Sequence, residues 1–403
     1  MMKRIYEAVL QEHFLDNDQM ALAPGPRQSG KTTVAKALCG QRKGGVYLNW
    51  DFPDDRELIL RGPSTLIEMT SNQHLAADAG FVALDEIHKL KHWKNYLKGY
   101  FDETKTQVKT LVTGSAKLDT FKKAGDSLMG RYFLYHIHPL SVAELLGRPY
   151  VPGEVSKPQK LSDDQWETLL EFGGFPEPYM RADSRFLNRW TQLRFQQLFE
   201  EDIHGFTRIT ELGKMEVFAK MLQRQSGGQL NYSHYAKLVQ VDSKTIRNWV
   251  DILKGFYHIF TIQPWHKNVS RALIKEPKFY LWDWSKIDDI GSRHETMVAL
   301  HLLKAVHFWQ DIGLGEYGLY FLRDKDQKEV DFLVTKNEKP WILLEVKSSG
   351  KERLSANLQH FQKQVQAEHV FQVAMDLPYK DIDCFSAGKP VIVPARTLLS
   401  QLV

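Results

Sequence analysis

The first 145 or so residues alternate short apolar runs with segments of helical periodicity. This alternation is typical of βαβ units, whose strands form a parallel sheet with helices on its faces. The runs that we expect to be strands span residues 20–23, 46–49, 81–84 and 110–113. The pattern therefore predicts an α/β domain with a parallel sheet over residues 1–147.

The rest of the chain changes pattern twice. Residues 148–160 are rich in proline and glycine and predict a linker. Residues 161–208 are helical in pattern and predict a helical lid. Residues 209–270 follow as a third segment, and from residue 271 to 403 a helix and several strands return, as in a second α/β domain.

The third segment predicts a winged helix-turn-helix. One helix would be capped by Ser233, a turn would fall at residues 240–242, and Ser243 would cap a second helix. The apolar run at residues 256–262 would then be a wing strand.

Composition narrows the class of protein. The chain has 403 residues, which is too long for one ordinary core and predicts two to four domains. With 43% hydrophobic and 25% charged residues it has the profile of a soluble globular protein. No apolar run approaches the ~20 residues that a membrane helix needs, and the first residues lack the pattern of a secretory signal. The two cysteines, Cys39 and Cys384, lie far apart in sequence and give neither a disulfide framework nor a metal-ligand spacing. We therefore expect a cytoplasmic protein that does not contact a membrane.

A phosphate-binding loop follows the first expected strand. The glycines of such a loop let backbone N–H groups surround a phosphate, at the positive end of the following helix. Lys31 would reach the β- and γ-phosphates, and the Thr32 hydroxyl would bind Mg²⁺. The sequence therefore predicts ATP binding with Mg²⁺. The pattern is matched by Gly25, Pro26, Arg27, Gln28, Ser29, Gly30, Lys31, Thr32 and Thr33.

Two acids end the strand expected at residues 81–84. Asp85 would hold Mg²⁺, commonly through water, and Glu86 would polarise the attacking water. Thr113 or Ser115, at the tip of the next strand, could sense the γ-phosphate, or this could be an ordinary turn. Arg131 could reach a phosphate in its own site or in a neighbour's, or it could be a surface charge.

The last domain carries acids at positions where apolar residues are expected. Asp331 lies in the middle of an expected strand, and Glu345 and Lys347 project from one face of the next. Glu295 lies on the inward face of a helix that begins near residue 291, where an unpaired carboxylate is costly. Such a set can serve phosphodiester cleavage, with Mg²⁺ or Mn²⁺ on Asp331 and Glu345, Lys347 orienting water and Glu295 assisting. The alternative is an ion pair on a strand and a satisfied buried acid.

Taken together, these motifs resemble those of prokaryotic AAA-type ATPases whose C-terminal half is a region of unknown function similar to PD-(D/E)xK nucleases. The resemblance implies ATP hydrolysis, a winged helix between two α/β parts, and a sensor or trans-acting role for Arg131. Met129 departs from the small residue that relatives often have there. The resemblance rests on residues 25–33, 84–86, 113–115, 128–131, 173–177, 328–332 and 345–348, with Glu295 matching the helix acid.

Two hypotheses follow for the function. In the first, ATP turnover moves or gates a nuclease-like domain that acts on DNA. In the second, the ATPase is a nucleotide-controlled switch, and a catalytically silent C-terminal domain binds DNA or a protein partner. A metabolic kinase would leave the C-terminal motifs without a role. Relatives of this type are often rings, so a homo-oligomer is a further expectation. If the second helix contacts DNA, its exposed polar residues are Lys244, Thr245, Arg247 and Asn248.

Overall fold

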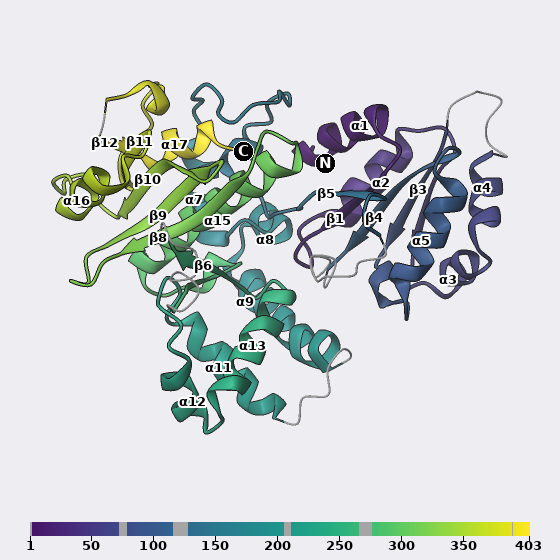
Figure 1. Ribbon diagram of the computed structural model, residues 1–403, viewed down its shortest axis with the longest axis horizontal. Coiled ribbons are helices and arrows are strands. Elements are labelled where there is room, and N and C mark those ends of the chain that lie inside the picture. The colour runs from purple at the N-terminus through teal and green to yellow at the C-terminus, as the bar shows by residue number, and fades with distance from the viewer. Residues whose placement is uncertain (1, 72–78, 116–127, 205–210, 266–275, 389) are drawn as a thin grey trace. The chain divides into compact units, whose positions relative to one another are not determined.

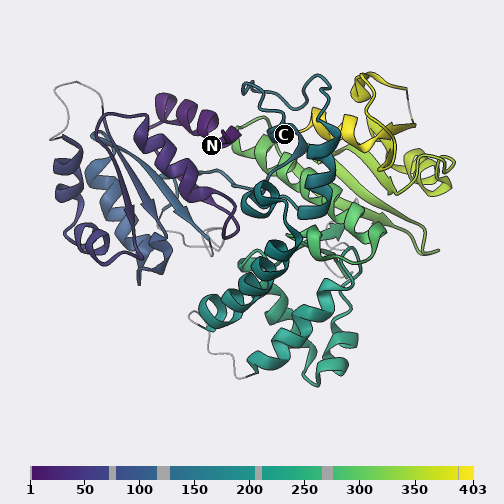
Figure 2. The same ribbon diagram turned by 180° about the vertical axis from the view of Figure 1, so that it is seen from behind.

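The computed structural model describes residues 2–71, 79–115, 128–204, 211–265, 276–388 and 390–403 (Figures 1 and 2). The chain divides into two compact units. Unit 1 comprises residues 1–139 and 149–151, and unit 2 comprises residues 140–148 and 152–403. The chain therefore passes between the units three times.

Unit 1 is built on a parallel sheet, which over the described residues has five strands in the order β2-β3-β4-β1-β5. Its elements are α1 (Ile5–Asp16), β1 (Met20–Pro24), α2 (Lys31–Gly40), β2 (Gly45–Asn49), α3 (Pro53–Leu60), α4 (Pro63–Ser71), β3 (Gly80–Asp85), η1 (Ile87–Lys89), α5 (Trp93–Thr104), β4 (Val108–Gly114) and β5 (Tyr132–Leu134).

The predicted strands at residues 20–23, 46–49, 81–84 and 110–113 are confirmed as β1, β2, β3 and β4. Helices α1 and α2 lie on one side of this sheet, and α4 and α5 lie on the other (Figures 1 and 2). Every residue of β1 and β3 is buried because both faces of the sheet are covered, which explains why these strands appear as continuous apolar runs. All pairs are parallel, so the carboxyl ends of the strands lie along one edge.

Unit 2 combines helices with a mixed sheet, which over the described residues has seven strands in the order β12-β11-β10-β9-β8-β6-β7. Its helices are α6 (Val142–Leu145), α7 (Asp163–Phe172), α8 (Pro176–Arg181), α9 (Ser184–Gln197), η3 (Leu198–Ile203), α11 (Leu212–Gln223), α12 (Tyr232–Val239), α13 (Ser243–Gly255), η4 (Trp284–Lys286), α15 (Ile290–Asp311), α16 (Ala356–Val365), η5 (Cys384–Ser386) and α17 (Ala395–Gln401). Its strands are β6 (Ile259–Pro264), β7 (Lys278–Leu281), β8 (Tyr317–Arg323), β9 (Glu329–Lys336), β10 (Lys339–Lys347), β11 (His369–Ala374) and β12 (Val391–Pro394).

The two helices expected around residues 240–242 are present as α12 and α13, and Gln240 ends the first in the left-handed conformation. The capping residues differ from the expected Ser233 and Ser243. Asn231 accepts a hydrogen bond from the backbone N–H of His234, and Asp242 accepts one from that of Thr245. Both helices thus begin earlier than expected. The run expected to be a wing strand forms β6, which pairs with β7 and β8 in the large sheet.

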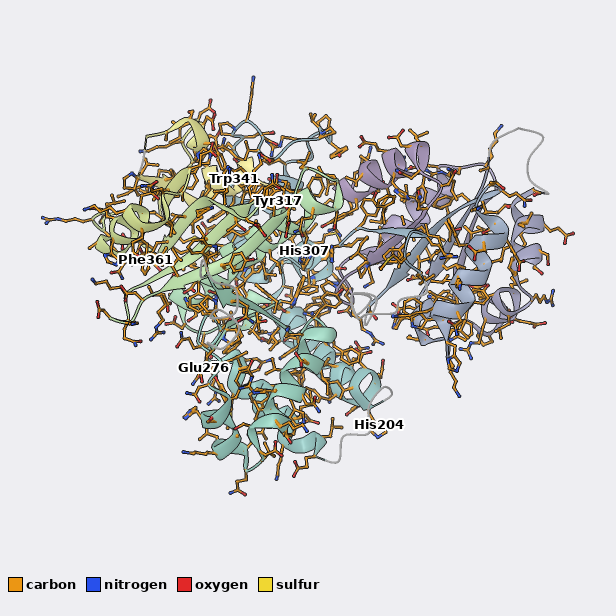
Figure 3. All side chains as sticks on the ribbon, in the orientation of Figure 1. His204, Glu276, His307, Tyr317, Trp341 and Phe361 are labelled. Carbon is orange, nitrogen blue, oxygen red and sulfur yellow. The ribbon has the colours of Figure 1, made fainter. Side chains whose placement is uncertain are left out.

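An aromatic cluster fills one end of the C-terminal sheet. Trp309 of α15 lies 5.1 Å from both Tyr317 and Trp341, measured between ring centroids. Figure 3 shows Tyr317 and Trp341 close together on the sheet. This cluster anchors the long helix α15, which carries Glu295, against β8 and β10.

A buried polar clamp holds α6 within unit 2. The ammonium of Lys304 on α15 lies 2.6 Å from the carboxylate of Glu144 and 3.0 Å from the hydroxyl of Ser141, and both charged side chains are almost fully buried. The ring of His301 accepts a hydrogen bond at Nε2 from the backbone N–H of Val142. Its Nδ1 lies 2.8 Å from the carbonyl oxygen of Met297. A carbonyl only accepts, so Nδ1 carries the hydrogen and the ring is neutral.

In the described part of the chain, no helix combines the length and the apolarity needed to cross a lipid bilayer.

We predict that unit 2 loses stability as pH falls because His301 must stay neutral. Burial lowers the pKa of His301 to about 4. Between pH 6.5 and 4 the unfolded chain therefore binds a proton that the folded chain does not. Protonation of this group in the unfolded chain should lower the free energy of unfolding by about 3 kcal/mol over that range.

The free energy of unfolding of His301→Gln, measured by chemical denaturation, should depend less steeply on pH, whereas that of the exposed His234→Gln should match the wild type. Equal slopes in all three proteins would contradict the assignment. Some slope should remain in His301→Gln, because burial also lowers the pKa of His258, to about 3.

Candidate functional site

The phosphate-binding loop lies where β1 ends and α2 begins. Gly30 has a φ of 95°, which favours glycine, and the helix starts directly after it at Lys31. Gly25 is required for a different reason. A Cβ atom on Gly25 would lie 2.1 Å from the carbonyl oxygen of Ile137, in the segment that continues β5. The loop is therefore pressed closely against its neighbouring chain.

The remaining loop residues complete a compact turn. The backbone N–H of Ser29 donates to the carbonyl of Pro26, and Gln28 adopts a φ of 63°. The ammonium of Lys31 is buried and donates to the carbonyls of Gly25 and Pro26 at 2.9 and 2.7 Å. These carbonyls hold a lysine side chain across the loop, at the positive end of α2.

Asp85 lies at the centre of the site. Its carboxylate is buried at the end of β3 and accepts hydrogen bonds from the hydroxyls of Thr32 (2.7 Å), Tyr47 (2.7 Å) and Thr113 (2.5 Å). These hydroxyls come from α2, β2 and β4. The structure thus brings the predicted Thr32, Asp85 and Thr113 together. Tyr47 was missed by the sequence analysis, although its place on the expected strand at residues 46–49 offered a signal.

Glu86 follows Asp85 with a positive φ of 56° and turns its side chain toward the tip of β4. The hydroxyl of Ser115 donates to its Oε2 at 3.2 Å, so the structure also brings these two predicted residues together. Burial raises the pKa of Glu86, and the charge of Lys31 partly opposes that shift. The same Oε2 lies 3.5 Å from Nε2 of His88, whose pKa burial lowers to about 3. Glu86 is therefore a half-buried carboxylate, 16% exposed, beside a neutral ring and 3.9 Å from the ammonium of Lys89. Its raised pKa makes it a stronger general base.

Arg4 is a buried residue of this site that the sequence analysis missed. Its guanidinium donates to the carbonyl oxygen of Ser29 in the loop and to that of His138 at 2.7 Å. The hydroxyl of Tyr6 accepts from the backbone N–H of His138 at 3.0 Å. The start of α1 is thereby tied to the phosphate-binding loop and to the segment behind it. In the sequence, Arg4 stands beside Lys3 and shows nothing that separates it from a surface charge.

Arg131 lies apart from the rest of the predicted nucleotide site. Its carbonyl accepts from the backbone N–H of Met20, at the amino end of β1, whereas the loop follows the carboxyl end. One strand length of roughly 15 Å separates the two edges. The guanidinium forms a bidentate ion pair with the carboxylate of Asp102, at 2.8 and 3.0 Å. Within its own unit, Arg131 is therefore directed away from the phosphate-binding loop.

The C-terminal acids do converge, but on a lysine that was not predicted. The ammonium of Lys278, on β7, lies 3.1 Å from Glu295, 2.6 Å from Glu329 and 3.7 Å from Asp331. Tyr280 adds a hydrogen bond from its hydroxyl to Glu295 at 2.7 Å. Burial and the charge of Glu295 raise the pKa of Asp331.

Glu345 and Lys347 lie next to this group as an ion pair at 2.8 Å. Asp331 also accepts from the backbone N–H of Val346 at 2.9 Å, which fixes β9 against β10 at this point. The second carboxylate oxygen of Glu345 is buried and has no hydrogen-bond partner among the described residues. The four predicted residues Glu295, Asp331, Glu345 and Lys347 are thus neighbours.

These residues do not fit a divalent metal as they stand. Over the described residues no group of three or more His, Cys, Asp or Glu side chains is arranged to hold one. The convergence point of Glu295, Glu329 and Asp331 is taken by the ammonium of Lys278. The buried oxygen of Glu345 is the one feature that suits a cation, and a single carboxylate oxygen falls far short of the six or more oxygen ligands that Mg²⁺ or Ca²⁺ takes.

The polar face of α13 is exposed. Lys244, Arg247 and Asn248 are exposed and Thr245 is half-buried, whereas Trp249 is buried in the helix pair. The guanidinium of Arg247 stacks on the ring of Tyr232 at 4.2 Å. Stacking of this kind orders the side chain and leaves its N–H edges available.

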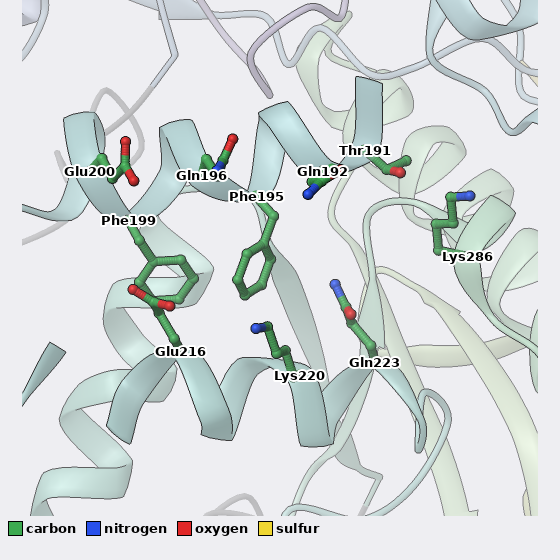
Figure 4. Close-up of a pocket in the computed structure, with 10 residues that line it drawn as sticks. All are labelled: Thr191, Gln192, Phe195, Gln196, Phe199, Glu200, Glu216, Lys220, Gln223 and Lys286. Carbon is green, nitrogen blue, oxygen red and sulfur yellow. The ribbon is translucent and has the colours of Figure 1, made fainter. Parts of the chain in front are cut away.

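A groove of about 550 Å³ opens between α9 with η3 and α11 (Figure 4). Phe195 and Phe199 form its apolar wall, and Lys220 and Glu216 face them from α11. Amide side chains and both signs of charge line the groove, so it has no marked preference for cations or anions. None of the predicted site residues lines it.

Three family models match consecutive parts of the chain. Residues 17–146 match a family model described as an AAA domain. Residues 163–286 and 290–386 match two models described as domains of unknown function (DUF8612 and DUF4143). The N-terminal unit therefore has the fold of an AAA-type P-loop ATPase, followed by a helical middle and a C-terminal mixed-sheet domain. The similarity of the last domain to nucleases stays a prediction.

Two relatives that match most of the chain are described as uncharacterized proteins. Uncharacterized proteins of Mycobacterium tuberculosis and Mycobacterium bovis are each 21% identical over 329 residues, covering 80% of this chain and 69% of theirs. Among solved structures, the ORC1 protein of Aeropyrum pernix in complex with DNA is 14% identical with a TM-score of 0.31, covering 73% of this chain and 90% of that one. AMPPCP-bound DnaA from Aquifex aeolicus is 12% identical with a TM-score of 0.32, covering 63% and 88%. Similarity at this level assigns no function to this chain.

We predict that Arg4 stabilises the loop that it contacts. Arg4→Met should lower the unfolding free energy of unit 1 by about 2–4 kcal/mol, because two buried carbonyls lose a charged donor. The neighbouring Lys3 is exposed, so Lys3→Met should change it by less than about 0.5 kcal/mol. Urea denaturation followed by circular dichroism measures both. If the two variants were equally stable, Arg4 would not be the anchor of the loop.

Proposed function

We propose that the protein binds and hydrolyses ATP with Mg²⁺ in its N-terminal unit, and that the bound nucleotide controls what the C-terminal part contacts. The observation that carries the first half is the convergence of Lys31, Thr32, Asp85 and Glu86 at the carboxyl edge of one parallel sheet. Crevices at this edge of open α/β sheets are where ligands commonly bind.

Each residue then has one task. The ammonium of Lys31 leaves the carbonyls of Gly25 and Pro26 for the β- and γ-phosphates, while the loop amides surround the phosphate. Thr32 and Asp85, whose oxygens already lie 2.7 Å apart, are the residues that would hold Mg²⁺. The metal would supply charge neutralisation on the phosphate oxygens. Glu86 accepts the proton of the attacking water, and its raised pKa favours that step. Ser115 keeps the Glu86 carboxylate in place.

For the second half we favour the switch over the nuclease. The Glu345–Lys347 pair and the buried oxygen of Glu345 are the observations on the nuclease side. The position of Lys278 argues against a nuclease, because its ammonium occupies the point where the carboxylates converge. Binding without cleavage fits both observations.

DNA is the partner that we propose for α13. Lys244, Arg247 and Asn248 point away from the core at the amino-terminal half of this helix, which is the half that reaches base edges in helix-turn-helix proteins. Asp251 near the other end makes that end less cationic, since it pairs with Lys254 at 3.7 Å.

A homo-oligomer would give Arg131 a phosphate to act on. It lies at the edge of the sheet opposite its own loop, and its side chain is 26% exposed beside Asp102. We therefore propose that it reaches a nucleotide held by a neighbouring chain, after release from Asp102.

The ATPase is tested by removing its charges one at a time. Lys31→Ala should lose turnover, because it removes the cation that faces the transferred phosphate. Glu86→Gln should still bind ATP, but its turnover should fall by about 10²–10⁴-fold. The exposed Lys43→Ala is the matched control and should turn over ATP at the wild-type rate. Phosphate release measures turnover, and calorimetry measures binding. Wild-type turnover in Lys31→Ala would overturn the proposal.

Glu86→Gln also tests assembly, because it should hold ATP without consuming it. Sedimentation of this variant with ATP and with ADP should differ. Identical sedimentation profiles in ATP and ADP would contradict the proposal that Arg131 reaches a nucleotide held by a neighbouring chain.

The DNA contact is tested on α13 itself. Lys244→Ala and Arg247→Ala should each weaken binding of duplex DNA and reduce its salt dependence by about one counterion. Lys254→Ala, at the other end of the same helix, should leave binding unchanged. Fluorescence anisotropy with ATP and with ADP gives both affinities. A nucleotide-controlled switch requires that the affinities for DNA with ATP and with ADP differ, so equal affinities would exclude the switch.

A further inference from the structure

We propose that Lys278 is a built-in counter-ion that takes the place of a divalent metal in the C-terminal acidic cluster, and that its removal would turn the cluster into a Mg²⁺ or Mn²⁺ site. The inference concerns unit 2 alone and does not rest on ATP turnover. The cluster consists of Glu295, Glu329, Asp331 and Glu345.

The position of the ammonium carries the argument. The Lys278 side chain is 5% exposed, so its charge is removed from water and must be compensated by the groups around it. The side chain begins on β7, and its ammonium lies 5.7 Å from the ring centroid of Phe321 on β8. It ends among acids from two other elements: Glu295 on α15, and Glu329 and Asp331 on β9. A long side chain has thus been directed to one point between a helix and a distant strand.

The carboxylates are arranged around a cation and not merely near one. Glu295, on α15, and Glu329, on β9, lie 3.1 and 2.6 Å from the ammonium. Their remaining contacts orient them. Tyr280 donates to Glu295, Arg323 lies 3.2 Å from Glu329, and the backbone N–H of Val346 donates to Asp331. Each acid is therefore held with one oxygen toward the same point.

A metal at this point would compete with the lysine. Mg²⁺ and Ca²⁺ bind oxygen at 2.0–2.6 Å and need several such ligands, so their position would coincide with that of the ammonium. Two cations within a few ångströms in a buried site repel strongly. Without the ammonium, Glu295 and Asp331 would lose the cation that they share, whereas Glu329 would keep Arg323 and Glu345 would keep Lys347. The buried oxygen of Glu345 would then be available as a further ligand. Hard cations favour such an all-oxygen set.

The experiment measures Mn²⁺ binding to the nucleotide-free full chain by electron paramagnetic resonance of the free ion. Lys278→Met keeps an unbranched side chain of similar length and removes its charge. Lys278→Arg keeps the charge. Lys336→Met is the matched control, because Lys336 pairs with Glu154 elsewhere in the same unit. Any Mn²⁺ held at the phosphate-binding loop is common to all these proteins and cancels in the comparison.

We expect Lys278→Met to gain one Mn²⁺ site, with affinity at least ~10-fold above any binding by the wild type, and Mn²⁺ to raise its melting temperature by mass action. Lys278→Arg and Lys336→Met should behave as the wild type. Adding Asp331→Asn to Lys278→Met should abolish the gain.

Two results would overturn the proposal. One is a folded Lys278→Met that binds no more Mn²⁺ than the wild type, with folding judged by circular dichroism. The other is a wild-type Mn²⁺ site that Asp331→Asn removes, and this arm decides the matter even if Lys278→Met does not fold. A Lys278→Met variant that folds only when Mn²⁺ is present would support the proposal.

Discussion

The N-terminal unit depends on a buried carboxylate that is satisfied by hydroxyls. Asp85 is 1% exposed, and a buried ionised acid costs several kcal/mol unless it is paired or hydrogen-bonded. Thr32, Tyr47 and Thr113 provide those bonds from three different elements. Each bond to a charged group contributes about 1.5–3 kcal/mol. The same contacts that let the acid be buried therefore hold the helix after the loop, and the strands on both sides, at fixed positions around it.

Much of this arrangement could be predicted from the sequence, because its signals are local. Continuous apolar runs identify strands that are covered on both faces, and a loop between such a strand and a helix places Lys31 and Thr32 at the strand's carboxyl end. Parallel pairing then puts Asp85 and Thr113 beside them. Helices α12 and α13 could also be predicted from the sequence, because their periodicity and the turn between them lie within 24 residues.

What the sequence did not reveal depends on contacts between distant segments. Arg4 reaches Ser29 and His138, and nothing near residue 4 indicates a buried cation. Lys278 stands at the start of an ordinary apolar strand, 17 positions before Glu295 and more than 50 before Asp331. The acids at residues 295, 331 and 345 were predicted to be neighbours, and they are, but the charge among them decides what they can bind. The predicted helix caps were wrong for a simpler reason. Each helix begins one or two residues earlier than expected, so the capping residues are Asn231 and Asp242 and not the two serines.

The clamp around α6 bears on how this polypeptide can be divided. Residues 140–148 belong to unit 2, where Lys304 and His301 of α15 hold them, while residues 149–151 belong to unit 1. The proline-rich stretch at 148–160 looks like the natural place to cut. A C-terminal fragment starting there would leave Lys304 as a buried charge without Glu144, and an N-terminal fragment ending at 147 would carry α6 with its partner surface missing. Neither unit is a contiguous piece of chain. Poor folding of an isolated fragment would therefore reflect the contacts removed by the cut and would not show that the unit itself is unstable.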